Sequence, residues 1–276
     1  MRKVTRSPSQ ARARDPWTVS GVASRTLRLT IAYDGTDLVG WQRQPAGVSV
    51  QGLLEDALAA FEGGPVTVHG AGRTDAGVHA LAQVASVSLT ACHDPQAIQR
   101  GLNAVLPAAV RVTEIMEAEP AFHARFAATG KIYEYRLVNA PFVSPFLARY
   151  AWHVPQRIDR GAMRDAGAAL TGRHDFAAFQ GTGSGVDETV RTLTSLEWRD
   201  GERPETPLVI TLSADGFLRH MVRNIVGTLV DIGMRRWPPE AIAGILASRD
   251  RARAGRTAPP QGLFLVAVQY REPNAL

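Results

Sequence analysis

Two halves of this chain repeat one order of predicted elements. Alternating apolar residues predict strands in the first half at 27–33, 66–69, 84–89 and 110–116, and helical periodicity predicts helices at 50–61 and 95–106. The second half has predicted strands at 131–138, 193–198, 208–214 and 263–270, with helices at 160–170, 217–232 and 239–247. The order β-α-β-β-α-β is that of a split βαβ unit, and the second half adds one helix. The sequence therefore predicts an α+β fold of two ferredoxin-like subdomains whose sheets join around a central active-site cleft.

This repeat divides the chain into an N-terminal subdomain, 25–125, and a C-terminal subdomain, 126–271, followed by a short tail, 272–276. Residues 1–24 are predicted to be a flexible basic tail, because they carry several Arg and Lys but one acid, Asp15, and lack the apolar stretch of a secretory signal. A mitochondrial transit peptide has a similar composition and stays open as an alternative.

A glycine-rich loop lies between two predicted strands of the first half. The segment from His69 to His79, HGAGRTDAGVH, places Arg73 two residues before Asp75 on a backbone loosened by three glycines. Glycine permits turns that other residues cannot adopt and lets a ligand approach the main chain. An Asp in such a loop often only closes a turn. Asp75 is therefore a candidate catalytic carboxylate, with turn formation as the alternative.

The same loop resembles the signature of the tRNA pseudouridine synthase A family, Gly-Arg-Thr-Asp-x-Gly-Val-His. Other segments resemble motifs of that family in the same order, and they lie at 31–51, 122–126, 131–135, 172–176, 217–227 and 258–263. The resemblance extends from about Leu29 to Tyr270. Several motifs in the right order make it far more specific than a single motif would be.

The resemblance implies an RNA-modifying isomerase that converts uridine to pseudouridine in the anticodon arm of tRNA, at positions 38 to 40. It implies that Asp75 is the catalytic carboxylate, that Arg73 helps to displace or replace the target base, and that Tyr133 stacks on it. It also implies a homodimer in which one tRNA contacts both subunits. No cofactor is expected for this reaction.

Arg223 is predicted to be the ion-pair partner of Asp75. It lies in an otherwise apolar predicted helix, and an unpaired charge in such a place is costly. A surface arginine whose stem packs along the helix is the alternative. Arg219 is placed one turn earlier on the same predicted helix, where it could contact a phosphate of the RNA.

Tyr133 and Tyr135 alternate with Glu134, so both tyrosines should face one side of their strand. Core packing alone would explain this pattern. A phenol with a pKa near 10 is a poor base at neutral pH, which favours stacking on the base as the role of Tyr133. Trp41 and Phe126 are further aromatic candidates, although core packing is the commoner role of such residues.

Composition excludes some classes of protein. The single Cys92 rules out an internal disulfide framework, and no apolar run reaches the roughly 18 residues of a membrane helix, so we expect a cytoplasmic protein without membrane contact. The histidines lack metal-ligand spacing, so no metal is expected. A net charge of +5 and a pI near 9.9 suit a polyanionic partner, but ordinary surfaces also carry such charge.

Two other functions stay open on the sequence. A non-catalytic tRNA-binding protein or chaperone could use the same scaffold, although the intact Gly-Arg-Thr-Asp loop favours an enzyme. A carboxylate-dependent hydrolase would need a second catalytic carboxylate, and Asp34 or Asp37 could supply it. Both lie in a Tyr-Asp-Gly-Thr-Asp segment whose composition indicates turn formation.

Overall fold

The computed structural model describes residues 24–183 and 185–271. Apart from Ser24, the predictions for the two tails, 1–24 and 272–276, lie outside these described residues. No helix in the described part of the chain is long and apolar enough to cross a bilayer.

The first half has the predicted order of elements. The bounds are β1 Arg25–Tyr33, α1 Val50–Glu62, β2 His69–Gly70, β3 His79–Leu89, α2 Pro95–Val105 and β4 Val110–Ala118. Local chemistry fixes both helix starts: the Ser49 side chain accepts a hydrogen bond from the Gly52 N–H, and Asp94 accepts one from the Ala97 N–H. Helix α1 ends at Gly63, whose positive φ of 74° favours glycine.

The second half has more strands than predicted. Its elements are β5 Ala128–Val138, β6 Trp152–His153, α3 Arg160–Ala168, β7 Gly172–Asp175, β8 Val190–Arg199, β9 Leu208–Ala214, α4 Met221–Gly233, α5 Ala241–Ser248 and β10 Leu263–Tyr270. The unpredicted strands β6 and β7 have two and four residues, too few to show an alternation in sequence. The predicted α+β class is confirmed, and the boundary at 125–126 stays a prediction.

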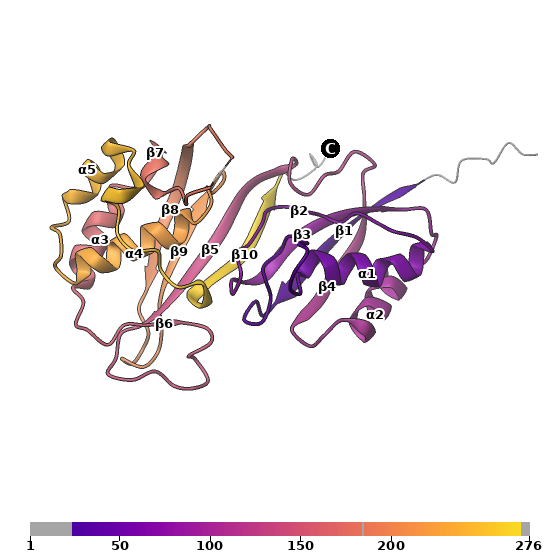
Figure 1. The fold of residues 1–276 in the computed structure, drawn as a ribbon, viewed down its shortest axis with the longest axis horizontal. Helices are drawn as coiled ribbons and strands as arrows, with labels where there is room; N and C mark the ends of the chain where they lie inside the picture. The colour runs from indigo at the N-terminus through magenta and orange to yellow at the C-terminus, as the bar shows by residue number, and fades with distance from the viewer. Residues whose placement is uncertain (1–23, 184, 272–276) are drawn as a thin grey trace, which may run out of the picture.

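The ten described strands form one mixed sheet. Its order is β4-β1-β3-β10-β5-β9-β8-β7, with β2 beside β3 and β6 beside β5. The last strand in sequence, β10, pairs in parallel with β3 and antiparallel with β5, so it joins the two halves. Figure 1 shows α1 and α2 beside the first-half strands, α3, α4 and α5 beside the second-half strands, and β5 and β10 between them.

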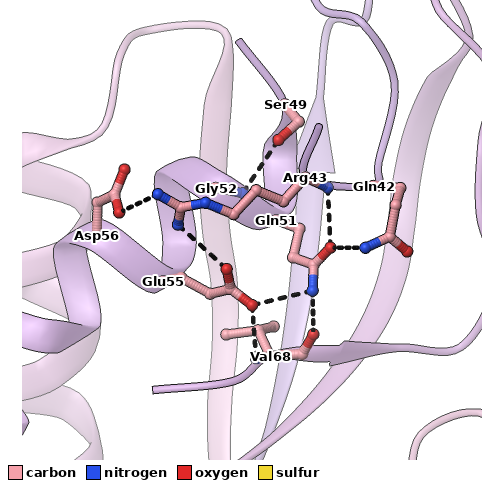
Figure 2. A network of polar contacts seen from close by, with 8 residues as sticks. All are labelled: Gln42, Arg43, Ser49, Gln51, Gly52, Glu55, Asp56 and Val68. Atoms are coloured by element: carbon pink, nitrogen blue, oxygen red, sulfur yellow. Dashed lines mark hydrogen bonds and ion pairs between the residues drawn. The ribbon is translucent and has the colours of Figure 1, made fainter. Parts of the chain in front are cut away.

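The predicted strand at 66–69 is wrong, because β2 covers only His69–Gly70. The Val68 N–H donates to Glu55 Oε1 at 3.1 Å, and the Val68 carbonyl accepts from Gln51 Nε2 at 3.1 Å (Figure 2). The main chain at Val68 is thus satisfied by side chains of α1 and does not need a strand partner.

The predicted helix at 217–232 also begins too early, because α4 starts at Met221. His220 precedes it with a positive φ of 58°, a left-handed conformation that cannot continue an α-helix. The placement of Arg219 one turn earlier on the helix of Arg223 is therefore wrong. This left-handed residue redirects the chain just before α4.

Candidate active site

The Asp75 loop connects β2 to β3 and is held by main-chain hydrogen bonds at both ends. The Ala71 N–H donates to the Val84 carbonyl at 2.8 Å, and the Val78 N–H donates to the carbonyl of Asp75 at 3.2 Å. Beside Asp75, the Thr74 hydroxyl lies 2.8 Å from the buried Tyr33 hydroxyl. These contacts fix the backbone that carries the carboxylate.

A second segment packs directly on this loop. The Trp41 N–H donates to the Thr74 carbonyl at 3.1 Å. The preceding Gly40 has a φ of 100°, and a Cβ there would lie 2.5 Å from the same carbonyl oxygen. Glycine is therefore required at Gly40 by both backbone conformation and space.

The network in Figure 2 fixes the chain that follows Trp41. Oxygen Oε1 of Gln51 accepts hydrogen bonds from the Arg43 N–H at 2.9 Å and from Gln42 Nε2 at 2.5 Å. The Arg43 guanidinium in turn contacts Glu55 and Asp56 on α1. Helix α1 thus anchors the segment that supports the Asp75 loop.

Asp75 meets residues from the start of α4. The Arg223 Nη1 lies 2.9 Å from Asp75 Oδ2, and the His220 Nε2 lies 3.4 Å from the same oxygen. The side chain of Arg223 is 13% exposed, that of His220 25% and that of Asp75 32%. The carboxylate is thus held on one side and still reachable from solvent.

These contacts decide the charge of Asp75. Burial alone would raise the pKa of Asp75, but hydrogen bonding and charge from His220, and then from Arg223, outweigh it and lower the pKa below the ordinary value of 3.8. Asp75 is therefore an anion throughout the neutral and mildly acidic range.

Arg223 is itself oriented by the backbone. Its Nε donates to the Ala258 carbonyl at 2.8 Å, and the Ala258 N–H donates back to the Arg223 carbonyl at 3.0 Å. The 258–263 segment, which leads into β10, thereby positions the guanidinium that faces Asp75.

His220 was missed by the sequence reasoning, which treated it as one of several scattered histidines. Its left-handed backbone turns the ring toward Asp75, and a Cβ on Gly181 would lie 2.6 Å from its Nδ1. The Gly181 N–H also donates to the Arg219 carbonyl at 2.7 Å. The spacing of three residues before Arg223 was the available signal, but the left-handed turn was not readable from the sequence.

Tyr133 lies on β5 with its side chain buried, and its ring meets the Phe217 ring edge-on at 5.1 Å between centroids. Burial, followed by the nearby Tyr33 and Asp75, raises the pKa of Tyr133 far above 10. Its phenol is therefore neutral, which fits a stacking role and argues against a role as a general base. The neighbouring Tyr135 is a core residue, whose hydroxyl donates to the Pro259 carbonyl at 2.8 Å.

The structure does not join the two remaining predicted site residues to Asp75. Arg73 is exposed, and its guanidinium makes no hydrogen bond or ion pair with residues 24–183 or 185–271. Arg219 is also exposed, and it donates to the carbonyls of Thr182 at 3.0 Å and Gly183 at 3.2 Å. The guanidinium of Arg73 can therefore contact a substrate without breaking a hydrogen bond or ion pair to the described part of the chain.

The two other aromatic candidates, Trp41 and Phe126, differ in their exposure to solvent. Trp41 is a buried core residue, whereas Phe126 is 77% exposed and packs on His123 at 4.3 Å between ring centroids. Phe126 is thus the one of the two that a solvent-borne ligand could reach.

The two carboxylates considered for a hydrolase have structural partners. Asp34 accepts hydrogen bonds from the Thr36 N–H at 3.0 Å and the Tyr150 hydroxyl at 2.8 Å. Asp37 pairs with Arg149 at 2.7 Å. Both fit the turn-forming role.

Comparison with known proteins identifies the family. A sequence model described as tRNA pseudouridine synthase matches residues 29–127 and 166–271. The chain belongs to the tRNA pseudouridine synthase family. It is 45% identical over 244 residues to the tRNA pseudouridine synthase A of Syntrophotalea carbinolica, covering 88% of this chain and 96% of that protein. It is 47% identical over 253 residues to the protein of the same name from Solidesulfovibrio magneticus, covering 90% and 92%.

A third tRNA pseudouridine synthase A, from Geotalea uraniireducens, is 42% identical over 247 residues, which are 89% of this chain and all of that protein. The resemblance to this family is confirmed. Asp75 and Arg223 lie within the matched segments, whereas Tyr133 lies between them. Membership in this enzyme family favours catalysis over the non-catalytic alternative.

Proposed function

We propose that this protein converts uridine to pseudouridine in the anticodon arm of tRNA, at positions 38 to 40. The carrying observation is the Asp75 carboxylate on the family's signature loop, paired at 2.9 Å with Arg223 and still open to solvent. The curated relatives are each named as tRNA pseudouridine synthase A.

The reaction breaks the bond from N1 of uracil to C1′ of the ribose, turns the base, and forms a bond from C5 to C1′. The proton lost from C5 is balanced by the proton gained at N1, so the product is an isomer. An ionised Asp75 acts as a nucleophile or stabilises positive charge that develops at the sugar. His220 and Arg223 together keep this carboxylate ionised, and Arg223 makes the shorter contact that orients it.

The target base must leave its stack to reach Asp75. The neutral Tyr133 ring provides a stacking surface beside the carboxylate. Arg73, which has no partner in the described part of the chain, is available to displace or replace the flipped base. The exposed Arg219 contributes charge for the RNA backbone near residues 182–183.

A homodimer in the cytoplasm is part of the proposal. A single tRNA would contact both subunits, one holding the stem and the other modifying the uridine. Analytical ultracentrifugation at working concentrations is expected to find a dimer, and a monomer with full activity would contradict this part.

The test is an assay with tRNA transcripts labelled with tritium at C5 of uridine. Release of tritium, together with mapping of pseudouridine at positions 38, 39 and 40, is expected for transcripts that carry uridine there. The matched control is the same tRNA with cytidine at all three positions. Release of tritium from the cytidine control would overturn the proposed function, and so would a lack of tritium release from both RNAs.

A further inference from the structure

Lys131 lies beside the Asp75 loop and has two cationic neighbours, Arg125 and Arg191. The charges of Arg125 and Arg191 each act on Lys131. Among the described residues, none of the three forms an ion pair; Arg191 Nη1 donates to its neighbouring Val190 carbonyl at 2.6 Å, and Arg125 lies over the Phe126 ring at 5.8 Å. We call these three residues the Lys131 cluster.

Lys131 is placed on the active-site side of β5. In a strand, residues two apart share a face, so Lys131 shares the face of Tyr133, about 7 Å along the strand. A Cβ on Gly72 would lie 2.8 Å from the Lys131 Nζ and 3.3 Å from its Cε. The ammonium group therefore packs against the same loop that carries Arg73 and Asp75.

This arrangement is unfavourable for the RNA-free protein. Burial, followed by the charges of Arg125 and Arg191, lowers the pKa of Lys131. Both arginines repel the Lys131 ammonium, no carboxylate of the described residues pairs with it, and this half-buried group has also lost hydration. A bound anion would relieve both costs, so the cluster is suited to an anionic ligand.

We propose that the Lys131 cluster binds the phosphodiester that flanks the target uridine and so sets the position of its ribose against Asp75. This inference rests on the proposed function. The separation between Lys131 and Tyr133 along β5 is comparable to the length of one nucleotide, so a base stacked on Tyr133 has its own backbone phosphate within reach of the ammonium. Lys131 is accordingly a substrate-positioning residue.

The first test compares Lys131→Gln with Lys131→Arg in the full-length chain. Each phosphate contact on single-stranded nucleic acid contributes about 0.7 to the slope of log affinity against log salt. Lys131→Gln is expected to weaken tRNA binding about tenfold and to flatten this slope by about that amount, whereas Lys131→Arg keeps both. Arg100→Gln on α2, which removes one exposed charge from a helix packed on β4 and α1, is the matched control and should change neither.

Thermal melting separates this role from a structural one. Removing a cation from among cations should leave the melting temperature of RNA-free Lys131→Gln unchanged or raised. A lowered melting temperature with unchanged tRNA affinity would overturn the proposal, because Lys131 would then support the fold and not the RNA.

The sharpest test uses a tRNA with one target uridine and one neutral methylphosphonate linkage, placed on the 5′ or the 3′ side of that uridine. At one of these positions, the neutral linkage should lower the tRNA affinity of the wild-type protein about tenfold. The same linkage should not lower the affinity of Lys131→Gln any further, because that variant has already lost the contact. A neutral linkage three nucleotides away should weaken both proteins equally. Equal losses at both flanking positions would overturn the proposal. This test measures affinity and not turnover. A protein that binds tRNA without turnover would therefore contradict the proposed function, while the affinity comparison would still decide the role of Lys131.

Discussion

Asp75 is the residue on which the proposed chemistry depends, and Asp75→Asn is its direct test. The amide keeps the shape of the side chain but cannot act as an anionic nucleophile. We expect pseudouridine formation at saturating tRNA to fall by at least about 10⁴-fold, as for removal of other nucleophiles. Stability should fall by about 1–3 kcal/mol, because Arg223 loses its charged acceptor.

Tritium release, tRNA affinity and thermal melting of Asp75→Asn should be measured together. Folded protein that binds tRNA and turns over near the wild-type rate would refute the role of Asp75.

Arg223, together with His220, should shape the acid limb of the pH-rate profile. The lowered pKa of Asp75 means that its ionic contacts stabilise the fold above the unfolded pKa, and that this stability is lost as pH falls through the folded pKa. Arg223→Gln removes one of the contacts that lower this pKa while burial remains, so the acid limb of kcat/KM should move to higher pH. Turnover at neutral pH should fall about 10²-fold.

Arg223→Lys is the matched variant, because it keeps the charge but loses the planar guanidinium that also bonds the Ala258 carbonyl. It should restore the acid limb and only part of the turnover. Coincident pH-rate profiles of Arg223→Gln and the wild-type protein would contradict the role of Arg223 in lowering the pKa of Asp75.

At the scale of elements, the Asp75 loop depends on the neighbouring segment that carries Gly40. Gly40→Ala forces a side chain into a left-handed conformation and against the Thr74 carbonyl. We expect a loss of about 1–3 kcal/mol in the free energy of unfolding and reduced turnover, because the displaced Thr74 precedes Asp75.

Gly64→Ala is the control, since no atom lies within 4 Å of a Cβ there and its φ is not positive. Denaturant unfolding and initial rates should be measured for both variants. Equal stability and activity of Gly40→Ala and wild type would show that Gly40 is not required.

At the scale of the whole molecule, the continuous sheet and its core are built from residues 25–270. Deleting residues 1–23 is therefore expected to leave the melting temperature and kcat unchanged. Affinity for tRNA should decrease at moderate salt, because these residues carry an excess of positive charge. A deletion variant that fails to fold would show that this segment packs on the described domain.

Local patterns were sufficient to predict most of the elements. Helix α1 was predictable from its apolar periodicity, and the observed caps Ser49 and Gly63 fix its ends. The alternation in β5 correctly placed Tyr133 and Tyr135 on one buried face. The short strands β6 and β7 escaped prediction because their formation depends on pairing with β5 and β8, which is not local information.

The sequence by itself determined the α+β class, the order of the first-half elements, the family resemblance and the identity of Asp75 as the candidate carboxylate. It also predicted Arg223 as the partner of Asp75, because an arginine in an apolar helix needs a counter-charge. These inferences depend on periodicity and composition within short segments.

Only the tertiary structure decided which groups surround that carboxylate. The left-handed turn at His220 brings its ring to Asp75 and separates Arg219 from α4, and the alignment of β5 with the loop brings Lys131 against Gly72. The physical reason is that each of these contacts joins segments distant in sequence, across a sheet whose two halves are joined by β10. No local sequence pattern specifies such contacts, because they form only once the two halves of the chain have packed together.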